Sequence, residues 1–314
     1  MKRNKFAIGA LLCLGMVFPG RSVSGAGAGR AATLPQAQAQ SKGQSQIKAS
    51  FGGNLSEGLA FAVIGDSGTG HKAQYDVARQ MATQHDNLPF DTVIMCGDNI
   101  YPKGDPAHFK AKFEEPYKGL LDNGVRFYAA LGNHDAEHGS KAELEYDKFG
   151  MGGHRYYSFA KRDGLVEFFS LDTTDMNTAQ MKWLEEALSA SKARWKVVFG
   201  HHPLYCSARR HGSTPELCTA LEPLFMRYKV VVVFSGHDHV YERVKPQNGI
   251  YYFTEGASGQ LRKGNLDRND PLFEAGDDQN NSFLLVWADA SQMTVEAIAA
   301  DGKVLDKATI LKGK

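Results

Sequence analysis

The sequence predicts an α/β domain built in layers, and three observations support this fold class. Apolar runs of strand length alternate with helical patterns from residue 59 onward. The last strand-like runs have no helix between them, which indicates antiparallel strands at the end of a sheet. Apolar residues make up 42% and charged residues 23% of the chain, which is ordinary for a globular protein and excludes global disorder. This alternation favours an α/β domain over a β-sandwich or a helix bundle.

The first segment of the chain differs from the rest. Several cations precede an apolar run at residues 6–18, and small residues follow at residues 22–29. This three-part pattern is typical of a secretory signal peptide. The alternative is an uncleaved membrane anchor, but the run is short for a helix that crosses a bilayer. We therefore predict a signal peptide at residues 1–25, an exported protein (periplasmic or secreted), and no stable membrane insertion after cleavage.

Residues 26–56 are rich in Gly, Ala, Gln and Ser and contain few large apolar side chains. We predict a flexible low-complexity lead-in there, followed by one folded domain over residues 57–314. The formal net charge is +1, and loss of residues 1–25 removes four cations and no acid, which leaves −3. No polybasic signature for nucleic acid or anionic membranes is present.

Each predicted element follows from its own pattern. The predicted strands are short apolar runs, at residues 59–64, 92–96, 125–131, 156–159, 166–171, 196–199, 230–234, 250–254, 283–288 and 293–299. The predicted helices carry apolar residues at helical spacing, at residues 72–84, 107–121, 178–190 and 215–228. In the third helix the buried stripe consists of Met181, Leu184, Ala187 and Leu188.

Five short polar clusters follow predicted strands, and each begins with glycine. They are Gly65-Asp66-Ser67-Gly68, Gly97-Asp98-Asn99-Ile100-Tyr101, Gly132-Asn133-His134-Asp135, Gly200-His201-His202 and Gly236-His237-Asp238-His239. In an open α/β sheet, the carboxyl ends of the strands gather at one edge, where ligands bind. The clusters are therefore expected to converge on one site although they lie far apart in the sequence.

The residue types in these clusters are suited to metal chemistry. Seven side chains supply oxygen and nitrogen donors without sulfur: Asp66, Asp98, Tyr101, Asn133, His201, His237 and His239. Such donors favour iron, manganese or zinc. Seven ligands are too many for one tetrahedral site with an open position, but they suit two ions that share a carboxylate. Taken singly, each Asp or Asn has a plain alternative as a turn residue. The spacing of His237 and His239 predicts two rings on one side of an extended chain.

The ordered set of motifs resembles the calcineurin-like metallophosphoesterase superfamily and, within it, the purple acid phosphatases. The family motifs GDxG, GDxxY, GNH[D/E], VxxH and GHxH all occur in order, the fourth from Val198 to His201. The chain length, Tyr101 and the stretch at His211 resemble the small, mammalian-like, tartrate-resistant members. His202 departs from those members, which usually carry Tyr there. The resemblance covers about residues 59 to 300 and implies a four-layer α/β/β/α metallophosphoesterase sandwich with mixed sheets.

The resemblance also implies a binuclear metal centre. Asp66, Tyr101 and His239 would bind Fe(III), while a divalent ion (Fe, Zn or Mn) would lie at the remaining nitrogen and amide ligands. Those ligands are Asn133, His201 and His237, and Asp98 would bridge the two ions. The function it implies is an acid phosphatase that hydrolyses the monoesters of small phosphorylated substrates by hydroxide activated by the two metals.

Catalytic side chains beyond the metal ligands are also predicted. His134 is the first candidate for protonating the leaving group, with Asp135 orienting its ring. His202 and His211 are candidates for substrate contact or proton donation. Arg209 and Arg210 either attract an anionic substrate or form an ordinary solvated loop. Two alternative functions stay open: a metallophosphodiesterase or nucleotide pyrophosphatase on the same fold, and a non-catalytic protein that binds metal or phosphate.

Two of the four cysteines, Cys206 and Cys218, flank a short polar loop. In an oxidising compartment they are expected to form a disulfide, and the alternative is two free thiols. The chain contains no Cys-x-x-Cys pair, so a zinc site with thiolate ligands is not expected.

Overall fold

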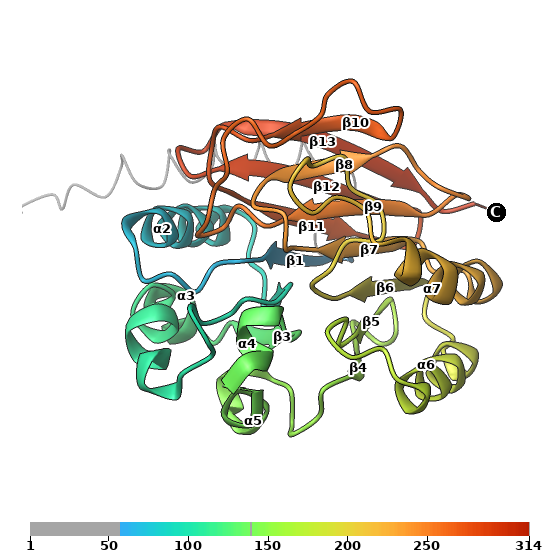
Figure 1. Cartoon of the computed structure of the whole chain (residues 1–314), viewed down its shortest axis with the longest axis horizontal. Helices are drawn as coiled ribbons and strands as arrows, with labels where there is room; N and C mark the ends of the chain where they lie inside the picture. Colours follow the sequence, from blue (N-terminus) through green and yellow to red (C-terminus); the bar gives the residue numbers. More distant parts are fainter. Residues whose placement is uncertain (1–56, 139, 314) are drawn as a thin grey trace, which may run out of the picture.

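The computed structural model describes residues 57–138 and 140–313, and Figure 1 shows their arrangement. The predictions of a signal peptide at residues 1–25 and of a flexible lead-in at 26–56 lie outside the described residues. Within these two ranges, no helix has both the length and the apolar character needed to cross a bilayer.

Two mixed β-sheets form the centre of the fold. The first sheet has the order β13-β12-β11-β1-β2-β3 and the second has the order β10-β8-β9-β7-β6-β5-β4. The first consists of β1 (Leu59–Ile64), β2 (Thr92–Met95), β3 (Arg126–Ala129), β11 (Ser282–Ala288), β12 (Gln292–Ala299) and β13 (Val304–Leu311). The second consists of β4 (Tyr157–Lys161), β5 (Val166–Ser170), β6 (Trp195–Phe199), β7 (Val232–Ser235), β8 (Tyr241–Val244), β9 (Tyr251–Glu255) and β10 (Phe273–Asp277). In the first sheet β1, β2 and β3 are parallel, and in the second β5, β6, β7 and β9 are parallel.

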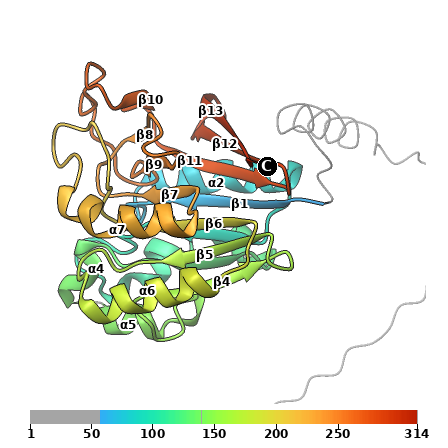
Figure 2. The same cartoon turned by 90° about the vertical axis from the view of Figure 1, so that its right-hand side faces the viewer.

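Helices cover the outer faces of the two sheets (Figures 1 and 2). The α-helices are α2 (Lys72–Asn87), α3 (Lys118–Asp122), α4 (Asn133–His138), α5 (Ser140–Glu145), α6 (Thr178–Ala190) and α7 (Pro215–Tyr228). Shorter turns are η1 (Pro106–His108), η2 (Lys110–Glu114) and η3 (Asp147–Phe149). Pro215 at the start of α7 has no N–H to leave unpaired in the first turn, which explains why this helix begins there.

Three buried apolar layers separate these four layers of secondary structure. Strand β1 shows how they arise, because successive side chains of a strand point to opposite faces. Ala62 and Ile64 pack toward α2, while Phe61 and Val63 pack toward the second sheet. A third apolar layer joins the second sheet to α6 and α7 through Leu184, Leu221 and their neighbours. The predicted α/β/β/α sandwich with mixed sheets is therefore confirmed.

The predicted helix at residues 107–121 is wrong as a continuous element. The segment forms the 3₁₀ turn η1, the π-helical turn η2 and the short helix α3. Pro116 explains the break, because proline lacks an amide hydrogen and its ring clashes with the carbonyl four residues earlier. That carbonyl, of Lys112, instead accepts a hydrogen bond from the Gln74 side chain at 2.6 Å.

Strands β8, β10 and β13 were not predicted from the sequence. In β13 the adjacent charges of Asp306 and Lys307 interrupt the apolar alternation, and the pairing with β12 shifts register between Ala297 and Ile298. Asp306 accepts hydrogen bonds from Tyr241 and Arg243, which lie on β8 of the other sheet. The strand is thus stabilised by a partner that only the folded chain supplies.

The disulfide expected between Cys206 and Cys218 is not formed, and both thiols are free. The Cys206 thiol donates to Glu242 at 2.9 Å, while the Cys218 thiol donates to the carbonyl of Leu204 at 3.0 Å. Each sulfur is therefore engaged by a different partner.

The interface between the sheets is tested by Phe61→Ala. The Phe61 ring is fully buried and contacts the Phe168 ring edge-on at 4.9 Å between centroids. Truncation should lower the free energy of unfolding by about 3–5 kcal/mol, because it removes apolar contacts and leaves a cavity. Guanidinium chloride unfolding measures the change. Met226→Ala, at a side chain 51% exposed, is the control and should change stability by about 0.5 kcal/mol or less. Equal losses for the two variants would contradict this assignment of the core.

Candidate metal centre

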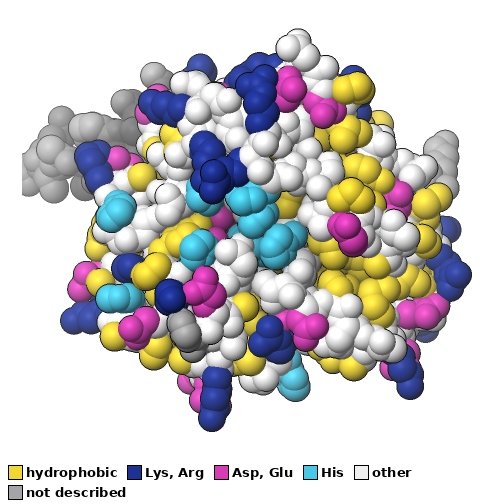
Figure 3. Space-filling model, in the orientation of Figure 1, with side chains coloured by type: hydrophobic (Ala, Val, Ile, Leu, Met, Phe, Trp, Pro, Cys, Tyr) yellow, Lys and Arg dark blue, Asp and Glu magenta, His cyan; other side chains and the backbone are white. Residues whose placement is uncertain are grey.

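The five polar clusters meet at one edge of the sandwich. Three of them follow the carboxyl ends of β1, β2 and β3 in the first sheet, and two follow β6 and β7 in the second. Figure 3 shows histidine side chains gathered at the centre of this face, with Lys and Arg side chains bordering them. The site therefore lies where loops of both sheets come together.

The first group of donors joins Asp66, Tyr101 and His239. The Tyr101 hydroxyl donates to Asp66 Oδ1 at 3.0 Å and lies 3.3 Å from His239 Nε2. The same Nε2 lies 3.4 Å from Asp66 Oδ1. Three donor atoms from three separate loops thus form a compact triangle.

The second group joins Asn133, His201 and His237. His201 Nε2 lies 3.0 Å from Asn133 Oδ1 and 3.1 Å from His237 Nδ1. The other ring nitrogen of His201 contacts the carbonyl oxygen of Cys96 at 2.9 Å, which sets the orientation of the ring. The Nε2 atom is consequently left pointing at the other two donors.

Asp98 lies between the two groups. Its Oδ1 is 3.5 Å from His201 Nε2 in the second group, and its carboxylate also interacts with the Tyr101 hydroxyl in the first. Asp98 is 1% exposed, so water does not compensate for its charge. A buried carboxylate shared by two donor groups is the arrangement that a pair of cations needs.

The residues present fit metal ions. Donors bound to one ion at about 2.1 Å lie about 3.0–3.4 Å apart, and the separations in both groups fall close to this range. Among the described residues, Asp66, Asp98 and His201 form one candidate cluster for a metal, and His201, His202 and His237 form another. His202 therefore also offers a nitrogen to the second group.

Burial and neighbouring charges both shift the pKa values of groups in the site. Burial raises the pKa of Tyr101, and the neighbouring Asp66 and Asp98 raise it further, so the phenol stays protonated without a cation. Burial lowers the pKa of His201, but the same two carboxylates outweigh this effect and the net shift is upward. Burial and the adjacent imidazoles lower the pKa of His237 to about 2. A bound cation would stabilise the negatively charged forms of the acidic groups in the site.

Backbone geometry places these side chains at a cost. Asp66, Asp98 and His237 have positive φ angles of 52°, 52° and 71°. Residues other than glycine rarely adopt this left-handed region, and such strain clusters at functional sites. His237 therefore does not continue an extended chain, so the condition for placing the His237 and His239 rings on one side of a strand is not met. Its ring lies in the second donor group, while that of His239 lies in the first.

Two glycines make room for the carboxylates. A Cβ atom at Gly132 would lie 2.2 Å from Asp98 Oδ1, and one at Gly236 would lie 2.4 Å from Asp66 Oδ2. Any larger residue at these two positions would push the carboxylates out of place.

His134 lies beside Asp98, but Asp135 does not orient its ring, and that prediction is corrected. His134 Nδ1 contacts the carbonyl oxygen of Pro102 at 2.7 Å, while Nε2 lies 3.9 Å from Asp98 Oδ2. The Asp135 carboxylate is fully buried and accepts backbone N–H groups of Asn99, Ile100 and Gly132. Asp135 therefore ties two loops together, and the Pro102 carbonyl holds the His134 ring.

His202 and His211 lie beside the second donor group. The His202 and His211 rings lie 4.4 and 4.1 Å from the His237 ring, measured between centroids. Burial and the charge of His201 lower the pKa of His202 to about 4.

The pKa of His211 is lowered too, chiefly by partial burial, and Asp238 opposes this shift. The positive charges of Arg210 and Arg262 lower that pKa further, so both guanidinium groups act on the rim of the site.

Thr173 was not predicted from the sequence, although it organises the His201 loop. Its hydroxyl oxygen accepts the backbone N–H of His201 at 3.2 Å and that of His202 at 2.9 Å, and contacts His202 Nδ1 at 2.9 Å. Its sequence signal is the polar run Asp172-Thr173-Thr174 directly after a predicted strand.

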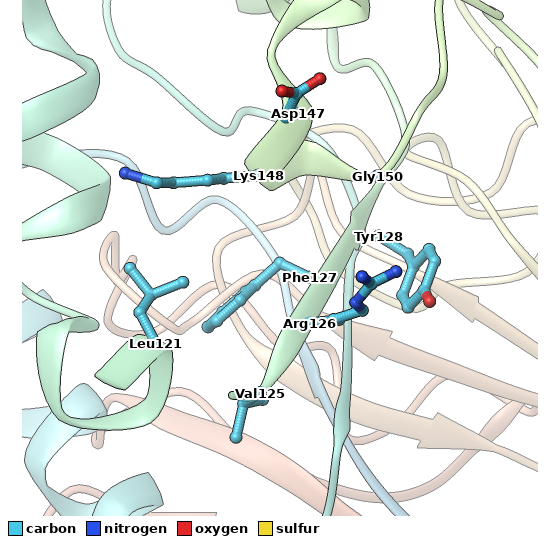
Figure 4. Close-up of a pocket in the computed structure, with 8 residues that line it drawn as sticks. All are labelled: Leu121, Val125, Arg126, Phe127, Tyr128, Asp147, Lys148 and Gly150. Carbon is cyan, nitrogen blue, oxygen red and sulfur yellow. The ribbon is translucent and has the colours of Figure 1, made fainter. Parts of the chain in front are cut away.

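A separate pocket of about 480 Å³ lies at the edge strand β3 (Figure 4). Phe127, Tyr128, Lys148 and Gly150 are among the residues that line it, and none of the metal-site residues does. The five polar clusters therefore lie at the loop edge and not in this pocket.

Comparison with known proteins now identifies the family. Residues 59–241 match the calcineurin-like phosphoesterase family, and this span includes all seven donors. The chain belongs to that family. It is 27% identical over 307 residues to human tartrate-resistant acid phosphatase type 5, with 84% of this chain and 94% of the relative covered. It is 30% identical over 243 residues to purple acid phosphatase 17 of Arabidopsis thaliana, with 67% of this chain and 71% of the relative covered.

Solved structures share the calcineurin-like phosphoesterase fold. A purple acid phosphatase from yellow lupin, PPD1, superposes with a TM-score of 0.67 at 20% identity, covering 81% of this chain and 54% of that one. GAP50 of Plasmodium, described as the anchor in the inner membrane complex, superposes with a TM-score of 0.72 at 21% identity. That match covers 82% of this chain and 90% of GAP50. At these identities the likeness concerns the fold alone.

The room that Gly132 leaves for Asp98 can be tested by Gly132→Ala. The new Cβ would displace Asp98, so metal affinity should fall about 10- to 100-fold, as it does when the support of a ligand is lost. The measurement is metal content per chain after dialysis against graded chelator. Gly119→Ala on α3 is the control, because the nearest atom to its Cβ is the Ala82 methyl group at 3.9 Å. Equal metal retention in both variants would refute this role of Gly132.

Proposed function

We propose that this chain is a metal-dependent acid phosphatase that hydrolyses phosphate monoesters of small substrates. One observation carries the proposal: six oxygen and nitrogen donors from loops of both sheets form two groups of three on either side of a seventh, Asp98. Membership of a phosphoesterase family and relatives named as acid phosphatases support the same reaction.

The metal ligands are proposed as follows. Asp66, Tyr101 and His239 would hold an iron(III) ion, for which a phenolate is a suitable hard ligand. Asn133, His201 and His237 would hold a divalent iron, zinc or manganese ion, and Asp98 would be shared by the two ions. When bound, such a pair of cations neutralises the phosphate oxygens and lowers the pKa of water.

His134 is proposed to serve the leaving group. Because Nδ1 faces the Pro102 carbonyl, that nitrogen carries a proton and donates it in a hydrogen bond. Nε2 remains on the side of Asp98 and is free to hold the proton that a departing alkoxide needs. His202 and His211 flank the second donor group and are proposed to contact the phosphate oxygens of the substrate.

Neither alternative function is favoured. A phosphodiesterase or nucleotide pyrophosphatase would need relatives or pocket features that point to a diester, and the relatives reported above carry acid phosphatase names. A non-catalytic metal- or phosphate-binding protein would not need a histidine held beside the donors as His134 is. Export, to a periplasm or the medium, is proposed from the pattern at residues 1–25.

The iron assignment predicts a coloured protein. Metal analysis of the purified protein should find one iron and one other ion per chain, with a visible absorption band from phenolate-to-iron(III) charge transfer. Tyr101→Phe should lose the band, because it removes the only phenol in the donor set. Tyr228→Phe, whose hydroxyl contacts Glu185 on the surface, should keep the band. A colourless protein with two zinc ions would refute the iron assignment and leave the phosphoesterase reaction standing.

The role of His134 predicts a dependence on the leaving group. His134→Asn should lower kcat for an alkyl phosphate such as glycerol 2-phosphate by about 10²–10⁴-fold, the usual contribution of a positioned acid. The loss should be far smaller for 4-nitrophenyl phosphate, because 4-nitrophenolate leaves without a proton. His154→Asn, at an exposed histidine, is the control. Equal losses on both esters would show that His134 does not act as the acid.

A further inference from the structure

The loop at residues 256–262 forms one wall of the metal centre. The backbone N–H of Gln260 donates to the carbonyl of Asp66 at 3.1 Å, and that of Arg262 donates to the carbonyl of His239 at 2.9 Å. A Cβ atom at Gly259 would lie 2.2 Å from the carbonyl oxygen of Ser67. The two hydrogen bonds reach Asp66 and His239, which are donors of the first group. The backbone of Arg262 is therefore bonded directly to that of His239.

The loop at residues 206–212 lies against this wall. Arg209 donates its backbone N–H to the carbonyl of Asn265 at 2.8 Å, and a short bridge pairs Ala208 with Leu266. The Arg209 guanidinium is occupied as well, because it pairs with Asp267 at 3.2 Å and contacts the carbonyl of Gly264. The two loops are therefore connected and together form a rim beside the site. Arg209 stabilises this connection through its backbone and its side chain.

Arg210 and Arg262 differ from Arg209 because no acid pairs with either in the described part of the chain. Arg262 Nη1 is buried and has no hydrogen-bond partner. A buried guanidinium donor without a partner is costly, and an anion is the natural group to occupy it. Arg210 is exposed and directly precedes His211, whose ring lies 4.1 Å from the ring of the donor His237, measured between centroids.

Asp238 lies against the loop at residues 206–212, but its carboxylate is already engaged. One oxygen accepts the backbone N–H of Gly212 at 2.9 Å and the other accepts the Asn265 amide at 3.2 Å. Asp238 is also fully buried beneath the rim. The two arginines therefore keep their positive charge available to a ligand, and Figure 3 shows such cationic side chains directly beside the histidine cluster.

We propose that Arg262 and Arg210 form an anion subsite beside the metal centre, which binds a second phosphate group on the substrate. The inference rests on the proposed phosphatase function and narrows its substrate class. The preferred substrates are phosphate monoesters that carry another phosphate a few bonds from the scissile one. Guanidinium groups suit this role, because their planar array of N–H donors matches the oxygens of a phosphate.

The test compares two esters that differ by one phosphate, 2,3-bisphosphoglycerate and 3-phosphoglycerate, on the metal-loaded enzyme. Each variant is characterised by the ratio of kcat/KM for the bisphosphate to kcat/KM for the monophosphate. Arg262→Gln and Arg210→Gln should each lower this ratio about ten- to a hundredfold, mainly through KM, because each loses one charge-assisted contact. Arg262→Lys keeps the charge and should recover part of the ratio.

Arg227→Gln is the matched control, because it also removes one positive charge but lies on α7 in a surface pair with Glu185. Its ratio should equal that of the wild type. Thermal melting of every variant shows whether the fold is kept, and Arg210, being exposed, gives a second route if Arg262→Gln unfolds.

The outcomes separate this inference from the proposed function. If 4-nitrophenyl phosphate is hydrolysed and the ratio is the same in wild type, Arg262→Gln and Arg210→Gln, the subsite is refuted and the phosphatase stands. If the metal-loaded wild type hydrolyses no monoester, the phosphatase proposal fails. Calorimetric binding of the two phosphoglycerates to wild type and Arg210→Gln then tests the subsite separately. If Arg210→Gln binds the bisphosphate more weakly than wild type does but binds the monophosphate equally well, the subsite is supported. If both proteins bind the bisphosphate equally well, the subsite is refuted.

Discussion

The site depends above all on the contacts of one buried carboxylate, that of Asp66. One oxygen accepts the Tyr101 hydroxyl from the β2 loop, and the other accepts the backbone N–H of His237 from the β7 loop at 2.8 Å. Its backbone is held as well, by Gly97 on one side and Gln260 on the other. A single fully buried residue therefore joins the loop edges of both sheets, and the relative position of the two donor groups follows from its place.

This arrangement concentrates backbone strain and buried charge at the loop edge of the sandwich. Three residues of the site have positive φ, two carboxylates are nearly inaccessible to water, and glycines provide the space between them. Each feature disfavours folding by itself. They persist because three apolar layers, packed above and below the sheets, stabilise the strands from which the loops emerge. A bound pair of cations would relieve the repulsion between the carboxylates, so metal binding and stability are expected to be linked.

The sequence predicts those features that are local. Strand β1 is uniformly apolar and ends at Gly65, so both the strand and the polar cluster after it are recognisable without a structure. The π-turn before Pro116 and strand β13 are different, because Gln74 and Arg243 stabilise them from distant parts of the chain. For the same reason, the sequence alone did not predict the roles of Thr173 and Arg262.

The orientation of His134 illustrates the limit within the site itself. Its sequence neighbour Asp135 is the obvious candidate partner, yet a helix begins at Asn133 and turns that carboxylate toward the backbone of the β2 loop. The Pro102 carbonyl takes its place at the ring. Adjacency in sequence is a poor guide to contact in the first turn of a helix, because consecutive side chains there point in different directions.

The charges of the site are layered by depth, and this order has a chemical consequence. The carboxylates and His201 are buried, the other imidazoles of the donor groups are half-buried, and the exposed Arg210 lies at the rim with the half-buried Arg262. Without bound cations, the buried carboxylates repel an anion, whereas the arginines at the rim attract it. Bound cations would neutralise Asp66 and Asp98, and the remaining positive charge at the mouth of the site would then favour an incoming phosphate. The acids at the base thus make anion binding conditional on the metals, whereas the arginines at the rim determine which anion is preferred.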